Sequence, residues 1–193
     1  FQAEDGIRDS SVTGVQTWLF RSYAERGGVD QIAQGMSGLM TISGNPGQGP
    51  IRTGIAVSDM TAGNLLALGV MMALFERQTT GKGRWVQTSL LESLLFMLDF
   101  QASRWLMKGE VAGQTGNDHP TGTPTGVYKT SDGYINIGAA GNGLFARLGD
   151  ELGHPEWKDK PEWKTIPLRT KDRPAVNGAI EKVTTTKIGR AHV

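Results

Sequence analysis

The sequence predicts an α/β fold, with a helix-rich first part and a smaller α+β part after it. A short apolar segment at 51–57 leads into a long apolar helix pattern over 61–77. A second helix pattern, with leucines at helical intervals, begins near Leu90. Beyond a change of composition at Gly109, two short strand patterns flank a Ser-Asp-Gly turn at 131–133, which predicts a hairpin.

In the first part, residues 51–57 are predicted to form a short strand. The helix over 61–77 is apolar on nearly every side, which predicts that it is buried, and glycines at 81 and 83 end it. Residues 85–88 are strand-like. Ser89 and Glu92 have the spacing of a capping box, so the next helix should begin there and continue towards Met107.

In the second part, residues 113–126 are rich in Gly, Thr and Pro and are predicted to be irregular. The hairpin should follow, then a short helix over 143–152 and a last amphipathic helix over 169–183. Residues 138–143 join a strand to a helix but lack the G-x-G-x-x-G order. They therefore predict a tight turn and not a nucleotide loop.

The composition excludes several classes of site. The 20 Lys and Arg balance 19 Asp and Glu, so charge gives no case for a nucleic-acid or acidic membrane partner. Cysteine is absent and the three histidines lie far apart, so no metal site is predicted. The longest uninterrupted apolar run, 65–75, is too short to span a bilayer, and no segment has the order of a signal peptide. We therefore expect a soluble cytoplasmic protein without a membrane partner.

Both ends of the chain look unlike native protein. Residues 1–17 have no useful period and resemble a translated sequencing-library adapter, and residues 188–193 resemble a second one. The alternative for each end is an ordinary disordered terminus. If both are adapters, the native sequence comprises a first part at 18–108 and a second at 109–187, and both natural flanks are missing.

Asp59 stands at the predicted strand-to-helix junction. A carboxylate there accepts hydrogen bonds from the free N–H groups of the first helical turn and lies at the positive end of the helix dipole. It would stay ionised at neutral pH, as a nucleophilic carboxylate must. The alternative is that Asp59 is only an N-cap.

The chain resembles the family III coenzyme A transferases, which include related acyl-CoA racemases. Five segments in the same order carry the resemblance, which covers roughly 26–183. They are DQIAQGMSGLM at 30–40, GIAVSDMTAG at 54–63, TGKGRWV at 80–86, HPT at 119–121 and GVYKTSDGYI at 126–135.

The resemblance implies a covalent mechanism at Asp59. The matching aspartate attacks an acyl-CoA thioester to give a mixed anhydride, then an aspartyl-CoA thioester that a small carboxylic acid attacks. Coenzyme A and acyl-CoA are then substrates, and no cofactor is permanently bound. The resemblance further implies that this chain is an internal piece of a longer protein with a large Rossmann-like domain and a smaller α+β domain. That protein is expected to form an interlocked homodimer.

The resemblance also assigns residues near coenzyme A. Gly27, Gly28 and Val29 match a segment that approaches CoA, and Asp30, a candidate substrate residue, matches an acidic or polar position near the catalytic carboxylate. A surface acid after a Gly-Gly turn is the alternative for Asp30. The related racemases have a histidine where this chain has Val29, and valine cannot transfer a proton. Transferase activity is therefore favoured over racemase activity. A CoA-binding protein without turnover is the remaining alternative.

The segment 117–124 matches the mobile glycine loop that covers the acyl intermediate in the family. Here it has one glycine and two prolines, which predicts a stiffer loop. His119, Thr121, Gly122 and Thr123 are its candidate substrate residues. His119 is suited to meet an acceptor carboxylate, although a lone loop histidine is more often merely solvated.

Overall fold

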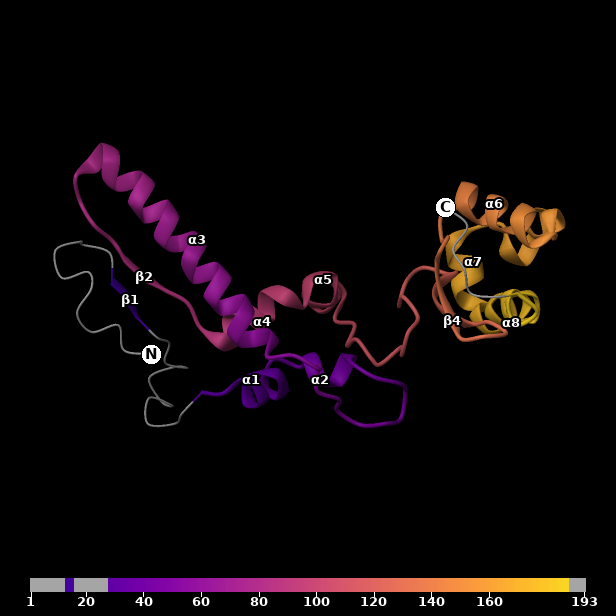
Figure 1. Ribbon diagram of the computed structural model, residues 1–193, viewed down its shortest axis with the longest axis horizontal. Helices are drawn as coiled ribbons and strands as arrows, with labels where there is room; N and C mark the ends of the chain where they lie inside the picture. Colours follow the sequence, from indigo (N-terminus) through magenta and orange to yellow (C-terminus); the bar gives the residue numbers. More distant parts are fainter. Residues whose placement is uncertain (1–12, 16–27, 188–193) are drawn as a thin grey trace. The chain divides into compact units, whose positions relative to one another are not determined.

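The computed structural model describes residues 13–15 and 28–187, which fall into two compact units divided after Gln114 (Figure 1). The change of composition predicted this boundary five residues earlier, at Gly109. The described residues are mostly helical, and their strands form two two-stranded sheets. A larger parallel sheet of the Rossmann-like kind is not formed by these residues. Each unit is described by itself.

The first unit consists of five helices and one pair of parallel strands among its described residues. The helices are α1 (Asp30–Met36), α2 (Leu39–Ile42), α3 (Val57–Thr80), α4 (Leu90–Met97) and α5 (Asp99–Lys108). The strands are β1 (Thr13–Val15) and β2 (Trp85–Gln87), paired in the register Thr13 to Trp85. Helices α1, α3 and α4 pack on one another.

The strand predicted at 51–57 is wrong, because residues 51–56 have no regular structure and Val57 already belongs to α3. Two of the backbone groups that a sheet would have paired are instead satisfied by the Gln34 side chain. Its Oε1 accepts the Thr53 N–H at 2.9 Å, and its Nε2 donates to the Ile55 carbonyl at 3.2 Å. An apolar run in the sequence does not reveal whether its backbone groups bond to a neighbouring strand or to a side chain.

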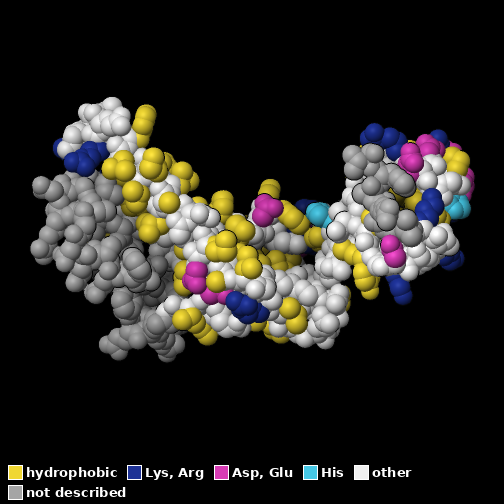
Figure 2. Space-filling model, in the orientation of Figure 1, with side chains coloured by type: hydrophobic (Ala, Val, Ile, Leu, Met, Phe, Trp, Pro, Cys, Tyr) yellow, Lys and Arg dark blue, Asp and Glu magenta, His cyan; other side chains and the backbone are white. Residues whose placement is uncertain are grey.

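Helix α3 is confirmed and is longer than predicted, with 24 residues ending at Gly81, whose φ is +66°. Its predicted burial is wrong within the described chain. Large apolar side chains are exposed along it, as Figure 2 shows; they are Met60, Leu68, Met71, Met72, Leu74 and Phe75. By length and composition alone, α3 is also long and apolar enough to cross a bilayer. The sequence prediction considered only the uninterrupted apolar run 65–75, which is too short to do so.

Strand β2 runs back along α3 (Figure 1), so closely that a Cβ at Gly69 would lie 2.7 Å from Val86 Cγ1. The next helix begins as the capping spacing predicted, because Ser89 Oγ accepts the Glu92 N–H at 3.0 Å. The predicted continuous helix to Met107 is interrupted. The chain turns at Asp99, whose φ is +49°, and α5 follows.

The second unit begins with the predicted hairpin. Strands β3 (Thr125–Lys129) and β4 (Tyr134–Gly138) pair antiparallel, and the Thr130 N–H donates to the Gly133 carbonyl at 2.8 Å across the turn. The helices that follow are α6 (Asn142–Leu152), η2 (Pro155–Asp159), η3 (Pro161–Trp163), α7 (Ile166–Lys171) and α8 (Arg173–Thr184). The single last helix predicted over 169–183 is thus divided between α7 and α8.

Aromatic side chains form the core of the second unit. Trp157 and Trp163, from two successive Pro-Glu-Trp-Lys segments, are 3% and 5% exposed, and their ring centroids lie 5.9 Å apart edge to face. Phe145 of α6 meets both rings, at 6.4 and 6.2 Å. Val176 and Ile180 of α8 close the cluster. The short repeat therefore supplies two tryptophans to one core.

Gly149 lies where α6 meets η2, and we expect Gly149→Ala to lower the free energy of unfolding of this unit by about 2 kcal/mol. A Cβ there would lie 2.8 Å from the His154 carbonyl oxygen, which belongs to the backbone and cannot turn aside. Urea unfolding followed by tryptophan fluorescence measures the effect. Gly143→Ala in the same helix is the control, because its Cβ would meet nothing within 4 Å. Equal effects at both positions would contradict the packing argument.

Candidate active site

Asp59 is the third residue of α3 and is exposed to solvent. It therefore lies in the first turn, where the helix dipole favours a negative charge, as the sequence predicted. The prediction that its own carboxylate caps the helix is not met, because Ala56 is the N-cap and no hydrogen bond joins the Asp59 side chain to the described residues. Its carboxylate is consequently open to an incoming reagent.

Asp30 supplies the capping carboxylate instead. Asp30 Oδ1 accepts the backbone N–H of Ser58 at 3.0 Å and the Ser58 hydroxyl at 2.8 Å. Asp30 Oδ2 accepts Gln34 Nε2 at 2.7 Å and a guanidinium N–H of Arg52 at 3.3 Å. Only 7% of Asp30 is exposed, so a residue 28 positions earlier in the chain satisfies a first-turn donor of α3 from inside the unit.

The Asp30 carboxyl has a pKa below its ordinary value of 3.8. Burial acts to raise the pKa, but the hydrogen bonds from Ser58, Gln34 and Arg52 together outweigh it. Because folding lowers this pKa, the ionised group stabilises the fold above the unfolded-state pKa, and that stability is lost as the pH falls through the lower folded-state value. At neutral pH the capping group is therefore fully charged.

The predicted CoA-approaching residues lie just before α1. Gly28 and Val29 are exposed, and Val29 is the N-cap of α1, with its carbonyl accepting the N–H groups of Ile32 and Ala33 at 3.0 and 3.1 Å. Gly27 lies outside the described residues. The apolar side chain of Val29 is 55% exposed and brings no proton-transferring group to this position.

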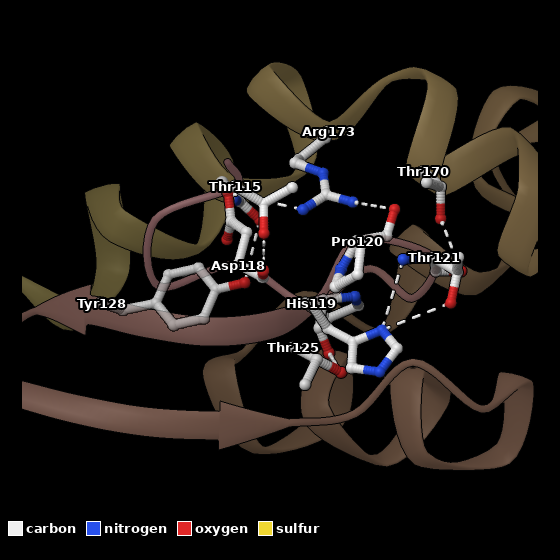
Figure 3. A network of polar contacts seen from close by, with 11 residues as sticks. Thr115, Asp118, His119, Pro120, Thr121, Thr125, Tyr128, Thr170 and Arg173 are labelled. Carbon is white, nitrogen blue, oxygen red and sulfur yellow. Dashed lines mark hydrogen bonds and ion pairs between the residues drawn. The ribbon is translucent and has the colours of Figure 1, made fainter. Parts of the chain in front are cut away.

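The four candidate residues of the loop 117–124 belong to the second unit and divide into two kinds. His119 and Thr121 are exposed, whereas Gly122 and Thr123 are buried. His119 Nδ1 lies 3.3 Å from the Thr121 N–H and 3.4 Å from its hydroxyl, and the His119 N–H donates to the Thr125 carbonyl at 2.8 Å (Figure 3). In this conformation solvent reaches His119 and Thr121.

Asp118 ties the same loop to α8 (Figure 3). Its carboxylate accepts Asn177 Nδ2 at 3.1 Å and pairs with Arg173 at 3.6 Å, while Asn177 Oδ1 accepts the Tyr128 hydroxyl at 2.9 Å. Burial, followed by the charge of Asp118, raises the pKa of Tyr128, so its hydroxyl remains a donor. A Cβ at Gly126 would lie 2.6 Å from Asp118 Oδ1, so glycine permits this approach.

Arg169 is a residue that sequence reasoning missed. It is 1% exposed, and its guanidinium donates to the carbonyls of Thr123 at 3.0 Å and Trp163 at 2.6 Å. It also donates to the Ala140 carbonyl and to Asn142 Oδ1 at 2.9 Å. Arg169 thus holds the buried end of the loop 117–124 against the core. The sequence placed it only at the start of an amphipathic helix, and no motif marks it.

The chemistry available at α3 is that of a carboxylate nucleophile. A carboxylate needs no base to be activated as a nucleophile, since its charged form is the one that attacks. The first unit contains no histidine, because all three lie beyond residue 114. Among the described residues, no group of three or more His, Cys, Asp or Glu is arranged to hold a metal ion.

Comparison with known proteins identifies the family. The sequence model described as CoA-transferase family III matches residues 12–191, a range that takes in part of each terminal segment set aside above. A succinyl-CoA:D-citramalate CoA-transferase of Chloroflexus aurantiacus is 32% identical over 148 residues, and the human succinyl-CoA:glutarate CoA-transferase is 37% identical over 151. The matches cover 76% and 78% of this chain.

The chain spans 37% and 34% of the length of these two relatives. A crystal structure of a CAIB/BAIF family protein from Brucella suis matches 92% of the chain and 46% of that protein, with 31% identity and a TM-score of 0.71. Sequence and fold agree over nearly the whole chain. The chain therefore belongs to CoA-transferase family III.

Proposed function

We propose that the protein containing this chain transfers coenzyme A from an acyl-CoA donor to a small carboxylic acid, with Asp59 as the nucleophile. The observation that carries the proposal is an exposed carboxylate in the first turn of α3, in a member of CoA-transferase family III. Such a carboxylate is accessible to a thioester, and a carboxylate can attack the thioester carbonyl as a nucleophile.

The proposed reaction alternates between two kinds of adduct on Asp59. Asp59 attacks the donor thioester carbonyl and CoA thiolate leaves, which gives a mixed anhydride. The thiolate then attacks the Asp59 carbonyl and releases the donor acid, leaving an aspartyl-CoA thioester. The acceptor carboxylate attacks that thioester, and the thiolate finally attacks the acceptor carbonyl of the new anhydride. Acceptor acyl-CoA leaves and Asp59 is regenerated, so each step exchanges one leaving group for another.

Small dicarboxylic acids are the proposed acceptor class. The two relatives described above are named for succinyl-CoA and for a dicarboxylic acceptor, and an Acetobacter aceti relative, 32% identical over 154 residues, is named an acetyl-CoA:oxalate CoA-transferase. Of the loop residues, His119 and Thr121 are the ones proposed to meet the acceptor carboxylate, because they are exposed. Gly122 and Thr123 are proposed to shape the backbone beneath it.

Gly27, Gly28 and Val29 are proposed to approach coenzyme A. Racemase activity is the weaker alternative, because it requires an acid–base pair beside the thioester and Val29 provides no proton-transferring group. The corresponding control is solvent deuterium exchange at the α carbon of a 2-methylacyl-CoA, which the proposed transferase should not catalyse.

We also propose that the complete protein is longer than this chain, and that it is a cytoplasmic homodimer. The large apolar side chains exposed along α3 support this proposal, because such a surface is usually covered by another part of the protein or by a partner. In that protein, β2 would belong to the Rossmann-like sheet of the large domain. A size measurement of the complete protein tests the dimer.

The direct test of the function is a CoA-transfer assay on the complete protein, with succinyl-CoA as donor and a panel of dicarboxylic acids as acceptors. We expect acceptor-dependent formation of a new acyl-CoA with ping-pong kinetics, since a covalent intermediate separates the two half-reactions. Tight CoA binding without any turnover would instead support a binding protein, and would contradict the proposal.

A further inference from the structure

We propose that Asp30 is a positioning residue, which holds the first turn of α3 through Ser58 and thereby orients Asp59, and that it does not touch substrate. This inference rests on the proposed function, since it explains how the proposed nucleophile is held. It assigns Asp30 a different role from the substrate contact that the resemblance suggested.

Asp30 has no free oxygen to offer a substrate. Its Oδ1 already accepts two hydrogen bonds from Ser58, and its Oδ2 accepts one from Gln34 and one from Arg52. The residue is 7% exposed. A carboxylate with both oxygens fully occupied inside the unit is a structural acceptor in this conformation.

Ser58 and Asp59 are neighbours in α3, so the direction of one side chain determines that of the other. Ser58 is fully buried, with 0% exposure, and Asp59 directly after it is exposed. Successive side chains project about 100° apart around an α-helix, so fixing Ser58 inward fixes the direction of Asp59. The bond from the Ser58 N–H to Asp30 also holds the turn in which Asp59 lies.

The segment that leads into α3 is held by the same hydrogen bonds of Asp30 and Gln34. Gln34 donates to Asp30 and accepts the N–H and hydroxyl of Thr53, at 2.9 and 3.0 Å. Among the described residues no strand pairs with the segment before α3, so the Gln34 side chain of α1 supports it in place of a sheet. Loss of the Asp30 carboxylate should therefore loosen both the segment and the first turn of α3.

Asp30→Asn tests the role, because an amide has only one oxygen. If that oxygen meets Ser58, the amide N–H groups face the donors of Gln34 and Arg52. We expect kcat for CoA transfer by the complete protein to fall at least about thirtyfold, with KM for acyl-CoA changed by no more than about twofold. Hydrogen exchange of the peptide over 57–61 should become at least about tenfold faster.

The double variant Asp30→Asn with Gln34→Glu separates positioning from substrate contact. It returns one carboxylate to the network, now at position 34, while the amide oxygen introduced at position 30 still accepts from Ser58. We expect kcat to recover to within about fivefold of wild type, because the bond to the Ile55 carbonyl is not replaced. Slow exchange over 57–61 should return with it.

Two other variants complete the series. Glu92→Gln changes an exposed first-turn acid of α4 and should leave both kcat and exchange over 57–61 unchanged. Ser58→Ala removes the hydroxyl bond but keeps the N–H bond to Asp30, so it should lower kcat only about threefold. It provides a milder test if Asp30→Asn does not fold.

The inference is overturned if the double variant restores slow exchange but leaves kcat as low as in Asp30→Asn, which would mean that the carboxylate meets substrate. It is also overturned if Asp30→Asn leaves exchange over 57–61 unchanged. Because exchange requires no turnover, a wild-type protein without CoA transfer would refute the proposed function alone. The exchange data would still decide whether Asp30 holds the turn.

Discussion

Asp59→Ala and Asp59→Asn should each lower kcat for CoA transfer by at least about a thousandfold, because neither side chain can form the anhydride. The fold should be unaffected, since Asp59 is exposed and does not cap α3. Measurement of kcat and KM with acyl-CoA donor and saturating acceptor gives the result, and thermal unfolding in parallel checks the fold.

Asp99→Asn is the matched control for this loss. Asp99 is likewise an exposed acid in the first turn of a helix of the same unit. Its φ of +49° is tolerated by asparagine, so the substitution should cause no backbone strain. We expect activity within about twofold of wild type. An Asp59→Asn protein that keeps more than a few per cent of wild-type activity would remove Asp59 from the covalent role.

Arg169→Met should destabilise the second unit by about 4 kcal/mol, because it leaves buried carbonyl groups without the charged donor that serves them. The carbonyls of Thr123 and Trp163 are among those affected. Urea unfolding followed by fluorescence reports this unit. Of the four described tryptophans, Trp157 and Trp163 are buried, whereas Trp85 and Trp105 are mostly exposed and contribute little to the blue-shifted emission. Trp18 lies outside the described residues and is replaced by phenylalanine in both proteins for this measurement.

Two substitutions bracket the Arg169 result. Arg169→Lys keeps the charge but lacks the planar fork that reaches several carbonyls, so an intermediate loss is expected. Arg147→Met removes an exposed arginine of α6 in the same unit and should change stability by no more than about 0.5 kcal/mol. If Arg169→Met proved as mild as Arg147→Met, Arg169 would not be what holds the loop 117–124.

Local sequence patterns predicted the elements whose signals lie within a few residues. The Ser89 cap, the hairpin around residues 131–133 and the turn before α6 depend on neighbouring side chains and backbone angles, and each is confirmed. The interruption at Asp99 was missed, because its left-handed backbone conformation occurs in a segment whose apolar pattern continues on both sides.

The predictions that failed depend on contacts distant in sequence. Asp59 has the local signature of a cap, yet the capping carboxylate comes from Asp30, which no periodicity connects with α3. The apolar pattern of α3 indicated burial, but composition cannot say which partner buries a helix, and the described residues cover little of it. Arg169 acts through carbonyl groups, which are present at every residue and leave no signal in the sequence.

The loop 117–124 was predicted to be stiff from its prolines alone, and its contacts with Arg169 and Arg173 provide further restraints. These contacts join the loop to α7 and α8, which the sequence pattern predicted only as one amphipathic helix. His119 and Thr121 remain the candidate substrate residues of this loop.

The most direct test of the account is peptide mass spectrometry of the complete protein, mixed with succinyl-CoA and quenched with hydroxylamine. Hydroxylamine attacks an aspartyl anhydride or thioester and leaves a hydroxamate on the residue that carried it. The account predicts a hydroxamate on Asp59, none on Asp99, and none in the Asp59→Asn protein. CoA transfer that proceeds with the adduct on another residue, or with no adduct at all, would contradict it.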